Sequence, residues 1–157
     1  MGENINYKFW TICMIRDQSK VLLLNRQHDE LKGYIPPGGK VEFPESFVDG
    51  AMREVKEETG LEVRNLVYKG LYEFVNPEKS DRYMIFNYIT DDFSGKLLKN
   101  PPEGEPMWVN IDEAVHLPMQ IATKISFPYF FKEGTFEIQI YWDNEKDQEG
   151  EVIVKRT

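Results

Sequence analysis

The chain has 157 residues, of which 41% are hydrophobic and 13% are aromatic, and its formal net charge is −8 at pH 7. This length and composition predict one folded domain over residues 1–157 and exclude a disordered chain. The acidic charge argues against a nucleic-acid duplex or an anionic membrane surface as the partner, because both attract basic patches.

Two strands are predicted at the start of the chain. Residues 7–16 and 20–25 are rich in β-branched, aromatic and other apolar side chains, and the residues between them are typical of a turn. Cys13, the single cysteine, lies within the first of these runs. One cysteine excludes an internal disulfide, and its apolar neighbours favour a buried thiol over a nucleophile.

A polar loop and a rigid turn follow these strands. Arg26 stands at the end of the second strand, and the loop at residues 27–33 contains His28. A single loop histidine is more often a surface residue than a ligand or a base. Residues 34–39 read Y-I-P-P-G-G, in which two prolines stiffen the approach and two glycines let backbone carbonyls point inward.

Residues 46–60 predict the central helix. Ser46 suits the N-cap, with Asp49 three residues later as a weak form of the capping box. Gly60 suits the left-handed residue that ends a helix. At about 100° per residue, one apolar stripe is expected to face the core. The residues of this stripe are Val48, Ala51, Met52 and Val55.

The rest of the chain alternates strands with short helices. Strands are predicted at residues 63–75, 82–90, 106–110, 135–142 and 151–155, a loop at 91–102, a short helix at 111–115 and an apolar helix at 122–132. Pro128 predicts a kink or an early stop in that last helix. Strands around a central and a late helix favour a mixed sheet between helices.

Three glutamates, Glu54, Glu57 and Glu58, gather beside the apolar stripe of the central helix. Glu54 and Glu58 are like charges four residues apart, which destabilises an isolated helix by about 0.2–0.5 kcal/mol. A divalent cation would turn this cost into a site, because clustered carboxylates are the hard oxygen ligands that Mg²⁺ and Mn²⁺ prefer. The alternative is a solvated acidic face with Arg53 and Lys56 as neighbours.

The whole segment 39–61 favours the metal site. Gly39, Glu45 and the run from Arg53 to Leu61 match the pattern G-x5-E-x7-R-E-U-x-E-E-x-G-U, where U is a bulky apolar residue. Every fixed position is present, and the segment resembles the signature of the Nudix hydrolases. The resemblance implies an α/β fold, the Nudix α/β/α sandwich with a mixed β-sheet between helices. It also implies an enzyme that hydrolyses a nucleoside diphosphate linked to another moiety.

The same resemblance implies roles for the matched residues. Mg²⁺ or Mn²⁺ would be held by Glu54, Glu57, Glu58 and the backbone carbonyl of Gly38. Arg53 would orient the glutamates through ion pairs, and Glu45 would do likewise or act through a bridging water. Lys40 could meet phosphate charge, or could be an ordinary solvated lysine.

Three acids are candidates for the general base. Glu54 lies in the matched segment, but a carboxylate that coordinates a metal is a poor base. Family members often use an acid on a loop outside this segment. Glu103 stands five residues before Trp108, a spacing similar to that of nucleotide-cleaning Nudix enzymes. Glu105 is the local competitor, and Glu103 is preferred.

The order of elements resembles the MutT-type branch, which removes oxidised purine nucleoside triphosphates. The candidate substrate-binding residues are Arg26, Tyr34, Tyr72 and Phe74. By approximate alignment Tyr34 takes the place of a pocket aromatic, and Tyr72 or Phe74 could stack a base. The alternative for these aromatics is packing in the core or on half-buried strands.

Three positions depart from the mammalian oxidised-purine enzyme. Ile35 stands where that enzyme has an asparagine, and Ala122 and Thr123 stand where it has paired aspartates. An apolar side chain cannot supply the hydrogen bonds to a base edge that give strong discrimination. Hydrolysis of 8-oxo-dGTP is therefore only one of the expected activities.

The sequence thus predicts a metal-dependent enzyme that cleaves a (d)NTP to the monophosphate and pyrophosphate. The alternatives are the same chemistry on a nucleotide sugar, ADP-ribose or a dinucleoside polyphosphate, and a Nudix-fold module that senses a nucleotide without hydrolysing it. A pure sensor has no need of three intact glutamates. Neither a basic leader with an apolar segment nor an apolar run long enough to span a bilayer is found, so a cytoplasmic protein is expected.

Overall fold

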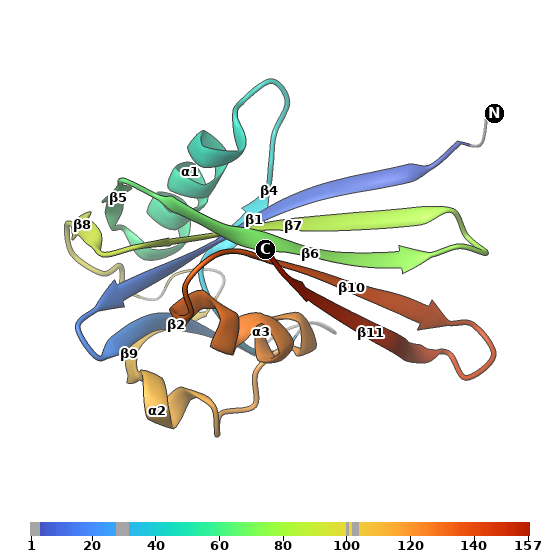
Figure 1. The fold of residues 1–157 in the computed structure, drawn as a ribbon. Coiled ribbons are helices and arrows are strands. Elements are labelled where there is room, and N and C mark those ends of the chain that lie inside the picture. Colours follow the sequence, from blue (N-terminus) through green and yellow to red (C-terminus); the bar gives the residue numbers. More distant parts are fainter. Residues whose placement is uncertain (1–3, 28–31, 100, 102–103) are drawn as a thin grey trace.

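A curled sheet lies between helices in the computed structural model, which describes residues 4–27, 32–99, 101 and 104–157 (Figure 1). The strands are Asn6–Asp17 (β1), Lys20–Arg26 (β2), Gly33–Ile35 (β3), Gly38–Lys40 (β4), Glu62–Arg64 (β5), Val67–Asn76 (β6), Asp81–Thr90 (β7), Asp92–Ser94 (β8), Glu105–Asn110 (β9), Phe136–Asp143 (β10) and Gln148–Arg156 (β11). The helices are Phe47–Thr59 (α1), Ile111–Ala114 (α2), Ile121–Ser126 (α3) and the 3-10 helix Phe127–Phe131 (η1).

The main sheet is mixed, as the sequence predicts. Within the described residues its strands run in the order β11-β10-β6-β7-β1-β2-β3, with β4 beside β1 and β9 beside β2. The pairs β1–β7 and β6–β10 are parallel, while β6–β7 and β10–β11 are antiparallel. Helix α1 covers one face, and α2, α3 and η1 lie on the other (Figure 1). This arrangement is the predicted α/β/α sandwich.

Each face of the sheet carries its own hydrophobic core. Side chains alternate along β1, so Cys13 and Ile15 pack beneath α1 while Ile12 and Met14 pack beneath α3 and η1. The buried cluster on the α1 side is Cys13, Ile15, Leu22, Ala51, Val55, Leu61, Val63 and Tyr88. Among the described helices, none is long and apolar enough to cross a membrane.

The ends of α1 follow the predicted capping. The Ser46 side chain accepts a hydrogen bond from the Asp49 backbone N–H at 3.0 Å, and Gly60 has a φ of 85°. The stripe prediction is wrong at Val48, whose side chain is 38% exposed. Phe47 makes the core contact of the first turn instead, with its ring 4.3 Å from that of Phe86.

Several predicted element bounds are also wrong. The single strand expected at residues 63–75 is divided at Asn65, which has a φ of 55°. Its first part, β5, pairs with β8 inside the predicted loop 91–102. The turn at residues 34–39 holds β3 and β4, which pair with β2 and β1. These short strands were not predicted because they form only by pairing with distant segments. The early stop predicted at Pro128 is confirmed, since α3 ends at Ser126.

Cys13 is predicted to be unreactive in the folded protein. Its side chain has no exposed surface, and burial raises the pKa of its thiol to about 12. Because the thiolate is the reactive form, a thiol reagent at pH 8 should label no cysteine in native protein and one per chain in denaturant. Rapid labelling of the native protein would contradict the buried placement of this thiol.

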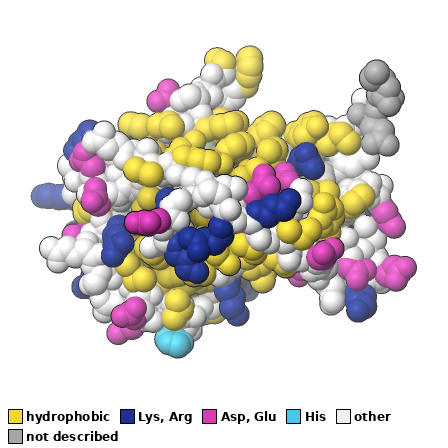
Figure 2. All heavy atoms as spheres, in the orientation of Figure 1, with side chains coloured by type: hydrophobic (Ala, Val, Ile, Leu, Met, Phe, Trp, Pro, Cys, Tyr) yellow, Lys and Arg dark blue, Asp and Glu magenta, His cyan; other side chains and the backbone are white. Residues whose placement is uncertain are grey.

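The charged side chains on one face of the molecule are of both signs. On the face shown in Figure 2, acidic and basic side chains are interspersed over a largely hydrophobic surface.

Candidate active site

The site begins where α1 presses against the glycines of β4. A Cβ atom on Gly39 would overlap the carboxyl group of Glu54, and one on Gly38 would overlap the carbonyl oxygen of Thr11. The Gly38 backbone N–H donates a hydrogen bond to Glu58 Oε1 at 2.8 Å. Gly39 therefore lets Glu54 reach the strand, and Gly38 lets β4 approach β1, close approaches that a side chain at either position would prevent.

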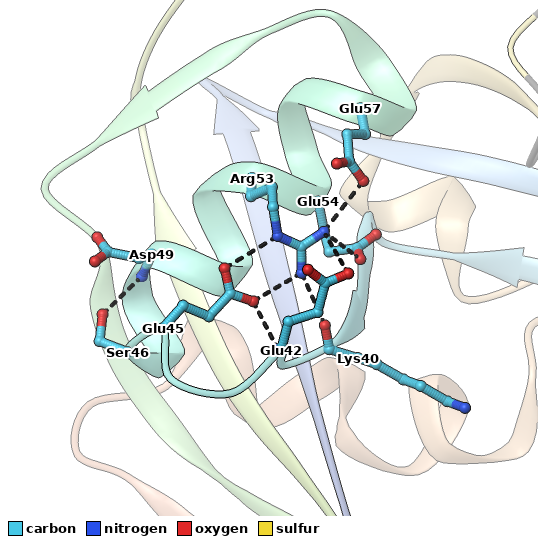
Figure 3. Close-up of polar contacts among 8 residues, drawn as sticks. All are labelled: Lys40, Glu42, Glu45, Ser46, Asp49, Arg53, Glu54 and Glu57. Carbon is cyan, nitrogen blue, oxygen red and sulfur yellow. Dashed lines mark hydrogen bonds and ion pairs between the residues drawn. The ribbon is translucent and has the colours of Figure 1, made fainter.

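Arg53 is the centre of the polar contacts (Figure 3). Its Nε and Nη2 donate to the two carboxylate oxygens of Glu45 at 3.0 and 2.8 Å. Its Nη1 donates to Glu54 Oε1 at 2.9 Å and to Glu57 Oε2 at 3.1 Å. Nη2 also donates to the Lys40 carbonyl oxygen at 3.0 Å. One guanidinium thus joins three carboxylates to the end of β4.

These contacts shift the acidity of the groups involved. The hydrogen bonds from Arg53 lower the pKa of Glu45 to about 2, with help from the backbone N–H of Glu42. The hydrogen bond to Glu45 in turn raises the pKa of Arg53. Burial raises the pKa of Glu54, although Arg53 acts in the opposite direction. Glu45 and Arg53 are therefore firmly ionised, while Glu54 bears a desolvation cost.

Glu45 is expected to make folding pH-dependent. Its carboxyl titrates near 2 in the folded chain against an ordinary 4.5, so the unfolded chain binds more protons between these values. The stabilisation is present above pH 4.5 and is lost as the pH falls towards 2. Denaturant unfolding from pH 2.5 to 6 should show this slope in full in the wild type and only in part in Glu45→Gln, where the lowered pKa of Glu62 still contributes. Glu42→Gln, a substitution at a side chain 71% exposed, should retain it; equal slopes in all three proteins would refute the assignment.

The expected metal ligands are only partly assembled. Glu58 is buried and the Glu54 side chain is 16% exposed, but that of Glu57 is 59% exposed and points to Arg53 (Figure 3). Within the described residues, no three acidic, histidine or cysteine side chains converge as a metal would require. The donor set nevertheless fits a hard divalent cation, since all its atoms are oxygens. Arg53 contacts one oxygen each of Glu54 and Glu57, so the second oxygen of each carboxylate could serve as a ligand.

A small cavity lies on the other face of the sheet, beneath α3. Its volume is about 40 Å³. Tyr72, which is 5% exposed, lines it, and burial raises the pKa of the Tyr72 hydroxyl to about 12. The full lining is Ile12, Ile35, Pro36, Tyr72, Ile85, Asn87, Gln120, Ala122, Thr123, Ser126 and Phe130. The three positions where this chain departs from the mammalian enzyme are thus brought together around one cavity.

The other candidate substrate residues are placed differently. Phe74 is not part of the cavity lining, because its ring stacks on Tyr83 at 5.4 Å and lies 5.7 Å from Trp142. Tyr34 is half-buried, and its carbonyl accepts from the backbone N–H of Gln120 at 3.2 Å at the rim of the cavity. Arg26 is half-buried at the end of β2.

The remaining candidates from the sequence are two acids, Glu103 and Glu105, together with His28 and Lys40. Glu103 and His28 lie outside the described residues. Glu105 is exposed at the start of β9, opposite Asn25 of β2. Lys40 is exposed, and its side chain extends away from the carboxylates around Arg53 (Figure 3).

Asn87 is the cavity residue that sequence reasoning missed. It is 2% exposed and lies in β7 between apolar neighbours. A polar amide in the run Met84 to Ile89 is the signal that could have revealed it, because a buried amide needs hydrogen-bond partners. The sequence pattern alone does not show that this amide faces the cavity of Tyr72.

Comparison with known proteins identifies the family. Residues 8–130 match the family model described as NUDIX domain. The chain is 32% identical over 112 residues to the uncharacterised Nudix hydrolase YvcI of Bacillus subtilis (strain 168), covering 69% of this chain and 70% of YvcI. It is 47% identical over 70 residues to YtkD of the same organism, which bears the provisional name 8-oxo-dGTP diphosphatase, covering 45% of this chain and 41% of YtkD.

The solved structures agree with the sequence comparisons. The crystal structure of a MutT protein from Bacillus halodurans superposes with a TM-score of 0.82 at 27% identity, covering 94% of this chain and 97% of that one. The family model matches more than half of the chain, and the structural superposition covers 94% of it. The chain therefore belongs to the Nudix hydrolases, enzymes that act on nucleoside diphosphate derivatives.

Proposed function

We propose that this Nudix hydrolase cleaves a (d)NTP to the monophosphate and pyrophosphate, with Mg²⁺ or Mn²⁺ bound at the acids of α1. The observation that carries the proposal is the junction of α1 with β4, where Glu54 and Glu58 lie against Gly39 and Gly38. Together with Glu57 and the Gly38 carbonyl, these acids provide the oxygen ligands that such ions prefer. A bound divalent ion polarises a phosphoryl oxygen and lowers the pKa of a bound water.

The contacts of Arg53 support a positioning role for this residue. Its guanidinium holds Glu54 and Glu57 on one nitrogen and is itself held by Glu45 through two hydrogen bonds. Glu45 thereby fixes the plane of the Arg53 guanidinium and the position of Nη1, which donates to Glu54 and Glu57. Lys40, with its charge extended into solvent beside the site, is proposed to attract the phosphates of the substrate.

The general base is proposed to be Glu103, with Glu105 as the competitor. Glu54 is the weaker candidate, because its carboxylate is proposed as a metal ligand and already accepts a hydrogen bond from Arg53. A base outside α1 would leave the acids of α1 free to hold the cation. Glu103→Gln and Glu105→Gln, compared in one assay, separate these two residues.

The cavity beneath α3 supports a nucleotide as the substrate. Its lining residues Ile35 and Pro36 lie three and two residues before Gly38, whose backbone carries a proposed metal ligand. Tyr72 is proposed to contact the base, with Tyr34 bonded to the lining residue Gln120 and Phe74 in a supporting aromatic cluster. Arg26, at the end of β2, stays a proposed substrate-binding residue. The similarity to YtkD makes 8-oxo-dGTP one of the triphosphates to test.

A nucleotide panel tests the proposal. Purified protein is incubated with (d)NTPs, 8-oxo-dGTP, ADP-ribose, nucleotide sugars and a dinucleoside polyphosphate, each with Mg²⁺ and with Mn²⁺. Release of pyrophosphate from a triphosphate is the expected result, and Glu57→Gln controls for contaminating enzymes. Release of phosphate alone, or turnover only of the non-triphosphate substrates, refutes the (d)NTP assignment.

A further inference from the structure

The amide of Asn87 has a fixed orientation at the cavity. Its Nδ2 donates to the carbonyl oxygen of Gly70 at 3.2 Å and to that of Ile85 at 3.1 Å. An asparagine amide has two N–H donors and one oxygen acceptor, so both donors are used. Reversing the amide would place its oxygen against two carbonyl oxygens, which is unfavourable. The side chain can therefore present only Oδ1 to a further partner.

This oxygen is available for a ligand. Within the described residues, no group donates a hydrogen bond to Asn87 Oδ1, although the residue is 2% exposed and lines the cavity. Asn87 Oδ1 is not among the fully buried atoms that lack a hydrogen-bond partner, so the oxygen can be reached from the cavity. A ligand group that contacts it must supply an N–H or O–H, because an amide oxygen only accepts. Thr123 also lines the cavity, but its hydroxyl can rotate to donate or to accept and so imposes no such requirement.

The position of Asn87 relative to the proposed metal ligands suits a nucleotide. Ile12 of β1 pairs with Gly38 of β4 on one side and with Asn87 of β7 on the other. Gly38 and Asn87 are therefore two strand spacings apart, which is about 10 Å. That separation is comparable to the span from a base to the phosphates of one nucleotide. At about 40 Å³ the cavity admits the edge of a base rather than a whole ring.

We propose that Asn87 is a specificity-determining residue: its Oδ1 accepts a hydrogen bond from an N–H on the base edge that enters the cavity. The site then selects purine nucleotides that present an amino or ring N–H donor there, and rejects those that present only ring nitrogens and C–H groups. This selection replaces the hydrogen bonds that Ile35 and Ala122 cannot make. The inference rests on the proposed nucleotide substrate.

Equilibrium binding of nucleoside monophosphates tests this inference without catalysis. The wild-type protein is titrated in EDTA with AMP, GMP, 8-oxo-GMP and purine riboside monophosphate, the last of which carries no N–H on its base. The best donor-bearing nucleotide should bind about tenfold to a hundredfold more tightly than purine riboside monophosphate. Equal dissociation constants for all four, or no measurable binding of any, would overturn the inference.

Two variants assign the discrimination to Oδ1. The preference is the ratio of the dissociation constant of purine riboside monophosphate to that of the best donor-bearing nucleotide. In Asn87→Val this ratio should fall to about one. In Asn87→Asp an oxygen acceptor is retained, so part of the preference should remain. Because each preference is a ratio within one protein, a general loss of stability cancels. A preference that persists unchanged in Asn87→Val would overturn the inference.

A matched control separates specificity from packing. Asn76 is also 2% exposed and hydrogen-bonds to Asn144, but it is not part of the cavity lining. Asn76→Val should lower stability and leave the preference intact. Binding is measured in EDTA and therefore does not depend on hydrolysis. If the protein discriminates between bases but hydrolyses no triphosphate, the proposed activity alone is refuted. If it hydrolyses triphosphates without discriminating between bases, only the role of Asn87 is refuted.

Discussion

Replacing Glu57 with glutamine is expected to lower kcat/KM by about a hundredfold to a thousandfold. The substitution keeps the shape of the side chain and removes the charge that is proposed to bind the cation. Metal stabilisation of the transition state is worth several kcal/mol, and each 1.36 kcal/mol is a factor of ten in rate. Turnover measured against Mg²⁺ concentration should show both a lower maximum and a weaker apparent metal affinity.

Stability should change little in this variant. The Glu57 side chain is 59% exposed and accepts a hydrogen bond from Arg53 at 3.1 Å. Exposed ion pairs typically contribute about 0–1 kcal/mol. The midpoint of urea unfolding should therefore stay close to that of the wild type.

Glu62→Gln is the matched control for Glu57. Glu62 is 60% exposed and forms an ion pair with Lys56 at 3.0 Å, just beyond the end of α1. The same substitution there removes an equally exposed charge that is not a proposed ligand, so kcat/KM should stay within about twofold of the wild type. Wild-type turnover by Glu57→Gln at all Mg²⁺ concentrations would show that Glu57 is not a ligand.

Replacing Arg53 with lysine is expected to reduce both activity and stability. A lysine ammonium has three donors on one atom and cannot reproduce the planar fork that contacts Glu45, Glu54, Glu57 and the Lys40 carbonyl. Loss of residues that orient metal ligands typically costs about tenfold to a hundredfold in activity or metal affinity. With the Arg53 side chain 24% exposed, the stability loss should be about 1–2 kcal/mol.

Arg64→Lys is the control for this substitution. Arg64 lies in β5, is 49% exposed and contacts Asp92 at 3.5 Å and Ser94 at 3.2 Å. Its replacement should change the free energy of unfolding by less than about 0.5 kcal/mol and leave kcat unchanged. If Arg53→Lys behaved like Arg64→Lys in both assays, the guanidinium would have no positioning role.

The local part of the fold was predictable because its causes are local. Ser46 and Gly60 mark the ends of α1, since capping depends on the cap residue and the nearest turn. The apolar runs that became β1 and β2 were recognisable by composition. Val48 was misplaced because the helical stripe does not show which of two neighbouring residues, Phe47 or Val48, meets the sheet.

Contacts between distant segments were not predictable in the same way. The pairing of β5 with β8 joins two three-residue strands that carry no pattern of their own. The cavity assembles Tyr72, Asn87 and Thr123 from three separate elements. Its position follows from strand register and from the packing of α3, neither of which is encoded in any one segment.

The sequence by itself determined the chemistry available to this protein: the spacing of Gly39, Glu45, Arg53 and the three glutamates defines the Nudix segment and its oxygen donors. Only the tertiary structure decided how these groups meet. It showed that Arg53 engages Glu54 and Glu57, and that Asn87 lines the cavity with its Nδ2 bonded to two backbone carbonyls. The reason is physical, because residue types set which bonds can form, whereas sheet register and helix packing set which partners come within reach.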